Sequence, residues 1–236
     1  MNKFLTLCLV LLVGSVYAAD NEIYVDQSGA TANLDLEQLG SGNIIGGTNS
    51  TAGDLTALDL DGNTMTLDIN QIGSSNKFLG DILANTFTGF FEFDGDSNVF
   101  NIQVDPTDTY GADSGNFNVD VTGSSNDFTL NVGTSAMAST LDLDWIIQGD
   151  SNEFDFDIDY DSATNYVDVD GDSNTVTFDA DGYANGYFYL DHTGNDRTFN
   201  IQQQSLLARD WLKILSTGSN GTICVIQDDD GTAVGC

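Results

Sequence analysis

The chain has 236 residues, of which 37 are acidic and only 5 are basic, so its formal net charge is −32 at pH 7. A surface this acidic repels nucleic acid and anionic membranes, which excludes both as expected partners. Hydrophobic residues nevertheless make up 40% of the chain and aromatic residues 10%. Because they alternate with polar residues, they favour a folded β-structure over an acidic disordered tail.

The first 18 residues have the pattern of a secretory signal. Lys3 precedes an apolar run from Phe4 to Val13, and small residues lead up to Ala18. A membrane anchor is the alternative, but the apolar run is much shorter than the roughly 20 residues that span a bilayer. We therefore predict cleavage after Ala18 and a secreted, extracellular or cell-surface location. Removal of residues 1–18 leaves 4 basic and 37 acidic residues, a net charge of 4 − 37 = −33.

A turn motif, Gly-x-x-Asn, recurs along the rest of the chain between strand-like stretches. Successive turn glycines lie 22 to 33 residues apart, and degenerate copies follow at Gly194 and Gly218. Gly62 divides the longest interval, which indicates that one repeat consists of two similar halves. The glycine and asparagine of each full copy are Gly40 and Asn43, Gly73 and Asn76, Gly95 and Asn98, Gly123 and Asn126, Gly149 and Asn152, and Gly171 and Asn174.

Apolar residues alternate with polar ones on both sides of each turn. Val167 and Val169 precede Gly171, for example, and Val176 and Phe178 follow it. This pattern predicts an all-β fold, a β-solenoid of about 22-residue two-strand repeats, with strands stacked at a spacing of about 4.8 Å. Glycine permits positive φ at the turn, and the asparagine is expected to hydrogen-bond to its equivalents in adjacent coils. The weakly patterned segment 44–57 is expected to be a loose coil or a loop.

Residues 205–236 differ from the repeats and are predicted to be an atypical C-terminal cap or docking segment. The stretch 205–215 is either one amphipathic helix over the end of the solenoid or a variant strand with Trp211 and Leu215 turned outward. Cys224 and Cys236 are expected to form a disulfide that closes a terminal hairpin, as export would allow. A cap would oppose polymerisation and a docking patch would favour it, and both alternatives stay open.

Two of the turns carry a more specific pattern, because Gln38 precedes Gly40 and Asn43, and Gln71 precedes Gly73 and Asn76. This Gln-x-Gly-x-x-Asn pattern resembles the curlin repeats of bacterial curli fibres, over residues 19–204. The resemblance implies a secreted subunit that stacks with its own copies or a related subunit into an extracellular amyloid-like fibre, which serves in biofilm matrix and surface adhesion. It also implies export through a dedicated outer-membrane channel. Later repeats depart from the pattern and predict a more hydrophobic core, since the glutamine position holds Phe93, Val121, Ile147, Val169, His192 and Ser216.

The acidic residues suggest no dedicated cofactor site. The segment 168–172 superficially resembles a calcium loop, but its glycine is misplaced and its twelfth position is aspartate, so no EF-hand is expected. Aspartates at alternate positions are predicted to point outward in columns, which calcium or high salt would stabilise by screening. A plain solvated acidic surface is the alternative. The aspartates in question are Asp155, Asp157, Asp159, Asp161, Asp168, Asp170 and Asp172.

Catalysis is not expected. Carboxylates are too abundant for any one pair to stand out, a thin rod offers no substrate cleft, and no Ser, Cys or Lys has an activating partner in the pattern. The single histidine, His192, is interpreted as a substituted core or edge residue. Two functions follow from the sequence. The first is a structural fibre subunit, and the alternative is a monomeric acidic β-solenoid that acts as an adhesin or ligand-binding rod, in one version stabilised by calcium.

Overall fold

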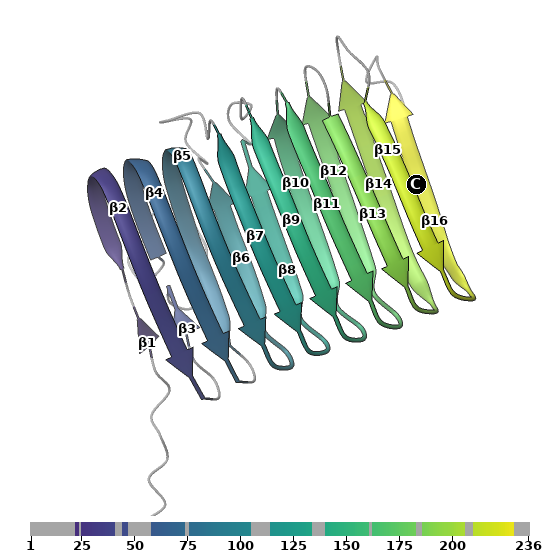
Figure 1. Cartoon of the computed structure of the whole chain (residues 1–236), viewed down its shortest axis with the longest axis horizontal. Helices are drawn as coiled ribbons and strands as arrows, with labels where there is room; N and C mark the ends of the chain where they lie inside the picture. Colours follow the sequence, from purple (N-terminus) through teal and green to yellow (C-terminus); the bar gives the residue numbers. More distant parts are fainter. Residues whose placement is uncertain are drawn as a thin grey trace, which may run out of the picture.

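The described part of the chain is entirely β-structure. The structure, a computed structural model, describes residues 22–23, 25–40, 44–46, 58–73, 76–104, 114–133, 140–160, 162–182, 186–205 and 210–228. Within these ranges the strands wind into one parallel β-solenoid, and each coil lies beside the next (Figure 1). The predicted all-β solenoid is confirmed. The predicted signal segment, residues 1–18, lies outside the described ranges.

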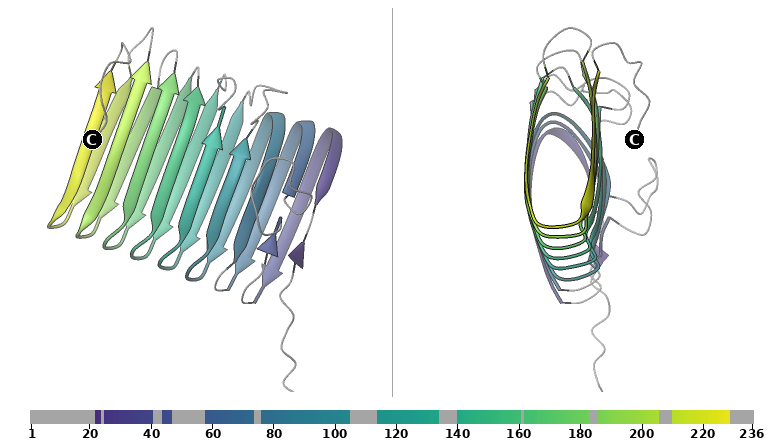
Figure 2. Two further views of the ribbon diagram at one scale, coloured as in Figure 1. Left: turned by 180° about the vertical axis from the view of Figure 1, so that it is seen from behind. Right: turned by 90° about the vertical axis from the view of Figure 1, so that its right-hand side faces the viewer.

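Two sheets face each other across a flattened ring, which the end view in Figure 2 shows. The odd sheet contains β7 (Gly115–Thr122), β9 (Leu141–Gln148), β11 (Ala163–Asp170), β13 (Gly186–Thr193) and β15 (Trp211–Thr217). The even sheet contains β6 (Val99–Val104), β8 (Asp127–Val132), β10 (Glu153–Tyr160), β12 (Thr175–Gly182), β14 (Arg197–Ser205) and β16 (Gly221–Asp228). Every strand pairs in parallel with its equivalent in the adjacent coil.

The first coils are closed at one side by long, curved strands. β2 (Asp26–Leu39), β4 (Leu58–Ile72) and β5 (Lys77–Asp94) each run from the even sheet around the bend into the odd sheet, so the two sheets are hydrogen-bonded into one. Two short strands, β1 (Glu22–Ile23) and β3 (Ile44–Ile45), pair with each other, and β3 also pairs with β5. The prediction of a loose coil or loop is therefore wrong for residues 44–45, and residues 47–57 lie outside the described ranges.

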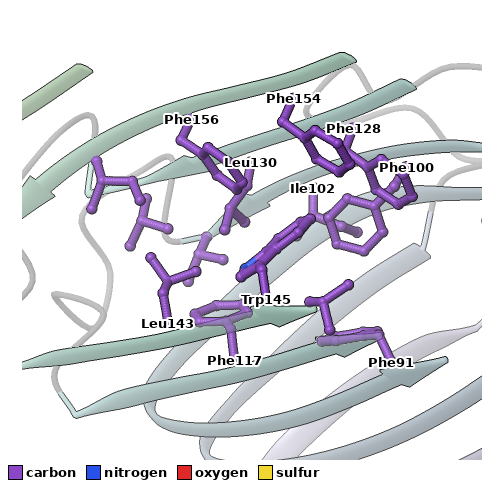
Figure 3. Close-up of a cluster of buried hydrophobic side chains, with 14 of the residues drawn as sticks. Phe91, Phe100, Ile102, Phe117, Phe128, Leu130, Leu143, Trp145, Phe154 and Phe156 are labelled. Atoms are coloured by element: carbon purple, nitrogen blue, oxygen red, sulfur yellow. The ribbon is translucent and has the colours of Figure 1, made fainter. Parts of the chain in front are cut away.

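The core is a thin apolar layer between the two sheets. In β9, as in most strands, buried and exposed residues alternate along the chain, as the sequence pattern predicts. Parallel pairing in register then places similar side chains beside each other in adjacent coils. Phe128 lies beside Phe154, for example, with ring centroids 5.0 Å apart. Figure 3 shows one part of this core, where the fully buried Trp145 lies against phenylalanines of the opposite sheet, among them Phe156 with ring centroids 4.7 Å apart. Single coils could not bury these side chains, so each coil depends on its neighbours.

The solenoid continues beyond residue 204. β15 pairs with β13 and β16 pairs with β14, in the same register as earlier coils. The helical alternative for residues 205–215 is therefore wrong over its described part, residue 205 and residues 210–215. The variant strand is confirmed, because Trp211 and Leu215 lie on the outer face of β15 and are 62% and 44% exposed. Alternation of Trp211, Lys213 and Leu215 with Leu212 and Ile214 has the period of a strand.

Candidate assembly surfaces at the two ends of the solenoid

The predicted turn residues form two continuous hydrogen-bond ladders. Each described turn glycine donates its N–H to the carbonyl that ends a strand in the next coil, for example Gly149 to Asp170 at 2.8 Å. Each described turn asparagine is buried, and from Asn98 onward its Oδ1 accepts the backbone N–H of the asparagine one coil earlier, for example Asn152 from Asn126 at 2.9 Å. The ladder runs through Asn76, Asn98, Asn126, Asn152 and Asn174, whereas Asn43 lies outside the described residues.

Glycine is required where the turn begins because coils approach closely there. Gly149 has a φ of 137°, and a Cβ at this position would lie 2.0 Å from the carbonyl oxygen of Gly123 in the preceding coil. Sequence reasoning missed a second feature of the turn, which is the left-handed conformation of its third residue, such as Ser151 with a φ of 59°. Serine is the commonest residue here, at Ser97, Ser125, Ser151 and Ser173, and Asp196 and Asn220 occupy the position in the two degenerate turns. The signal available in the sequence was the repeated polar residue directly before each asparagine.

The glutamines named by the family resemblance meet inside the solenoid. Gln71 Nε2 donates to Gln38 Oε1 at 2.7 Å, and both side chains are buried. Their column continues through four apolar residues to His192 and ends with Ser216, whose hydroxyl lies 3.2 Å from His192 Nδ1. The glutamine ladder is therefore short, and the more hydrophobic core predicted for later coils is present. The four apolar residues are Phe93, Val121, Ile147 and Val169.

The last coil leaves its inward side uncovered. We define the C-terminal end surface as Leu212, Ile214, Ser216, Ile223, Val225 and Gln227. By register these residues extend the core columns, yet Ile223 and Val225 are 41% and 39% exposed. Among the described residues no further strand pairs with β15 or β16 on this side. The result is a strip of apolar side chains beside two unpaired strand edges.

The first coil has the same character. We define the N-terminal end surface as the inward residues Ile23, Val25, Ala32, Leu34, Leu36 and Gln38, of which Ala32 and Gln38 are buried within the chain. Ile23, Val25, Leu34 and Leu36 pack against the core but are only partly buried. In the described part of the chain, β2 pairs with β4 alone, so no described strand lies along its other edge. Exposed edges of this kind are templates for pairing with another chain.

Aspartates cover the outer faces, but their columns are interrupted. Asp157 pairs with Asp179 and Asp159 with Asp181, whereas Asp155 lies between threonines of the adjacent strands. Burial, together with neighbouring aspartates, raises the pKa of Asp159 from 3.8 to about 6. The expected continuous columns of carboxylates are therefore replaced by pairs.

The other predicted aspartates also form no continuous column of carboxylates. Asp168 pairs with Asp191 on one side and with Ile146 on the other. Asp170 lies between Gln148 and Thr193, so it too has no carboxylate opposite it in either strand. Asp172 lies in a turn, where its Oδ1 accepts the N–H of Asn195 at 2.6 Å. Asp161 lies outside the described residues.

An aromatic strip occupies the outer face of the odd sheet near the C-terminal end. The rings of Tyr166 and Tyr189 stack with centroids 4.9 Å apart, and Lys213 Nζ lies 4.8 Å from the centroid of Tyr189. Tyr187 and Trp211 form the adjacent column, 37% and 62% exposed. These residues belong to consecutive strands, so the strip faces solvent as one surface.

The remaining features considered are the cysteines, a metal site and a membrane span. Cys224 is engaged in a disulfide bond, and Cys236 lies outside the described residues, so their pairing stays a prediction. The described residues contain no group of three or more His, Cys, Asp and Glu side chains arranged to hold a metal ion. They also contain no helix long and apolar enough to cross a membrane.

No protein-family model, curated protein or solved structure matches this chain.

Proposed function

We propose that this protein is a secreted structural subunit of an extracellular, curli-like amyloid fibre that contributes to biofilm matrix and surface adhesion. The observation that carries the proposal is that both terminal coils present partly or largely exposed inward-facing apolar residues beside strand edges with which no described strand pairs. A further copy stacked on either end would supply the neighbouring coil that each terminal coil lacks. It would pair the backbone N–H and C=O groups of the edge and cover the apolar residues.

The sequence features support the same proposal. A signal-like segment precedes the repeats, and a net charge near −33 without it keeps separate copies soluble until edges pair. The partner is a second copy of the chain or a related fibre subunit, reached after export through an outer-membrane channel. The proposal assigns no catalytic residue and no nucleic-acid contact.

Assembly of purified protein lacking residues 1–18 tests the proposal. We expect filaments that bind thioflavin T and give a cross-β reflection near 4.8 Å with the strands perpendicular to the fibre axis. The double variant Ile223→Lys/Val225→Lys places charges on the C-terminal end surface and is expected to remain a folded monomer. Its control is Thr222→Lys, which changes a residue of the same strand that alternates with Ile223 and pairs with Thr198. Persistent folded monomer for all forms, including the unchanged chain, would exclude the fibre function.

A second candidate function is a monomeric acidic adhesin or ligand-binding rod, and the aromatic strip favours it. The stacked, half-buried rings of Tyr166 and Tyr189 and the exposed rings of Tyr187 and Trp211 offer apolar faces beside carboxylates to a flat ligand such as a glycan. Under this alternative the protein remains a folded monomer and binds a surface or polysaccharide through Trp211. Loss of binding in Trp211→Ala, with no filaments from the unchanged chain, would favour it. Calcium belongs to this alternative as a stabilising ion.

A further inference from the structure

We infer that the two ends of the solenoid bind each other head to tail in one defined register, with β15 of one copy beside β2 of the next. This inference rests on the proposed fibre function and specifies its junction. In that register Ser216 of one copy lies opposite Gln38 of the next, and Leu39 lies opposite Thr217. The columns of paired residues that run through the chain assign each end residue a position along the strand.

The first match is a column that has polar residues at its two ends and apolar residues in the middle of the molecule. Gln38 and Gln71 occupy it at one end, and His192 and Ser216 at the other. Apolar residues occupy it in between. Stacking in register joins the two polar pairs, so that Ser216 meets Gln38. Each polar pair then continues into another polar residue at the junction instead of facing an apolar neighbour.

A second column in the even sheet has the same arrangement. Gln227 Nε2 donates to Gln203 Oε1 at 3.1 Å in the last coils, and Gln203 Nε2 is buried without a partner. The register places Gln27, in the first coil, at the same column position. Stacking therefore brings the backbone positions of Gln227 and Gln27 beside each other. The coils between hold apolar residues in this column, namely Leu60, Ile82, Val104, Val132, Ile158 and Ala180.

The apolar positions of the end surfaces also match. In the same register Leu212 meets Leu34 and Ile214 meets Leu36 in the odd sheet. In the even sheet Ile223 meets Ile23. All of these side chains are partly or largely uncovered in the single chain. Their burial between copies supplies the apolar contribution to the junction.

Charge complementarity is the fourth match. Lys213, one of 5 basic residues in the whole chain, lies on the outer face of β15. The register places it opposite Asp35, which is exposed on β2. Opposite charges directly across adjacent strands stabilise the pair.

Slipped registers lose part of this complementarity. A slip of two residues in one direction leaves Lys213 beside Glu37 but places Gln38 against Ile214, which buries an amide beside an apolar side chain. A slip of two in the other direction places Ser216 against Leu36 and Lys213 against Asn33. A slip of one residue exchanges the inner and outer faces entirely. The polar column therefore selects the register more strongly than the charge does.

Disulfide trapping in assembled protein tests the register. Leu39 and Thr217 are outward residues at opposite ends of one chain, so a disulfide in the double variant Leu39→Cys/Thr217→Cys must join two copies. Adjacent strands are about 4.8 Å apart, which suits a disulfide, whereas a two-residue offset gives about 8 Å, which does not. We expect oxidised fibres to yield a ladder of covalent multimers. Glu37→Cys/Leu215→Cys is a second in-register pair with the same expectation.

The matched control is Leu39→Cys/Leu215→Cys, which is offset by two residues and is expected to give no ladder. Fibres in which this control cross-links as well as the in-register pairs, or better, would overturn the register and leave the fibre function intact. Absence of fibres from the unchanged chain would overturn both.

Charge reversal provides an independent test. Asp35→Lys and Lys213→Glu each place like charges at the junction and are expected to slow elongation about two- to fivefold, as for an exposed ion pair. The double variant Asp35→Lys/Lys213→Glu restores opposite charges and is expected to regain the rate of the unchanged chain within about twofold. A double variant slower than either single variant would contradict the pairing. Circular dichroism of the monomers distinguishes this result from misfolding.

Discussion

At the scale of single residues, the turn asparagine is the most informative side chain. Asn152 is buried, accepts the N–H of Asn126 and donates Nδ2 to the carbonyl of Gly123 at 3.1 Å. It therefore satisfies backbone groups of two different residues where the chain reverses into a new coil. The sequence predicted the position and its hydrogen bonding, because the residue type recurs at a constant distance from glycine.

Replacement of this asparagine should destabilise the monomer. Asn152→Ala leaves a buried N–H and a carbonyl without partners, and we expect the free energy of unfolding to fall by about 2–3 kcal/mol. Urea denaturation followed by circular dichroism measures this change. Asn131→Ala, a half-buried position in the middle of β8, is the control and should change stability by less than about 1 kcal/mol. Equal losses for both variants would contradict a special role for the ladder.

The two unusual backbone positions of the turn should respond in different ways to substitution. Gly149→Ala introduces a Cβ against the backbone of the preceding coil, so we expect misfolding or a loss of more than about 3 kcal/mol. Ser151→Gly keeps the left-handed conformation without a side chain, so its effect should lie within about 1 kcal/mol of zero. Thermal denaturation of the two variants checks this contrast, which a simple preference for any small residue would not produce.

At the scale of single strands, the acidic pairs between β10 and β12 oppose folding at neutral pH. Desolvation and the neighbouring carboxylates Asp157, Asp181 and Asp179 raise the pKa of Asp159. We therefore expect Asp159→Asn to increase the melting temperature at pH 7. Asp155→Asn is the matched control, because its cross-strand neighbours are threonines, and its increase should be smaller. A lower melting temperature for Asp159→Asn would show that the carboxylate is stabilising.

These raised pKa values also predict how stability depends on pH. Asp81 and Asp159 each have a pKa raised from 3.8 to about 6, so between these values the folded state binds more protons than the unfolded chain. The free energy of unfolding should therefore fall as pH rises through this window and be higher near pH 4 than near pH 7. His192 acts in the opposite sense, because burial lowers its pKa and favours stability at higher pH. Urea denaturation at pH 4, 5, 6 and 7 measures the balance, and greater stability at pH 7 would contradict the dominance of the aspartates.

Alternation of apolar and polar residues predicted the strands almost everywhere, but it did not decide between strand and helix at the end of the solenoid. Trp211 and Leu215 are large apolar residues on an outer face, so the pattern of 205–215 fitted a helix as well as a strand. The pairing of β15 with β13 decides between them, because it extends two existing core columns through Leu212 and Ile214. Such long-range pairing is not visible in a local window.

At the scale of the whole molecule, repulsion between acidic copies should control assembly. With a charge near −33, stacking brings many carboxylates within a Debye length, which is about 10 Å at 0.1 M salt. We expect fibre growth, followed by thioflavin fluorescence, to accelerate as NaCl increases. CaCl₂ at equal ionic strength separates screening from binding. Equal rates would indicate screening alone, and a faster rate with calcium would indicate ion binding.

The repeat length predicted the solenoid, but the sequence could not show which ends would be open. Whether residues 205–236 cap the stack or extend it depends on the pairing of β15 and β16 with the preceding strands. The match between the polar residues of the first and last coils was likewise hidden, because Gln38 and Ser216 are separated by the entire set of repeats. It became visible only when the register of every intervening strand was known.

The two chain ends of the described solenoid lie at opposite ends of the rod, and each coil contacts mainly its immediate neighbours (Figure 1). A pulling force applied to the termini therefore acts first on the outermost coils, which have a neighbour on one side only. Mechanical unravelling should proceed one coil at a time, with a regular series of similar force peaks, instead of one abrupt rupture.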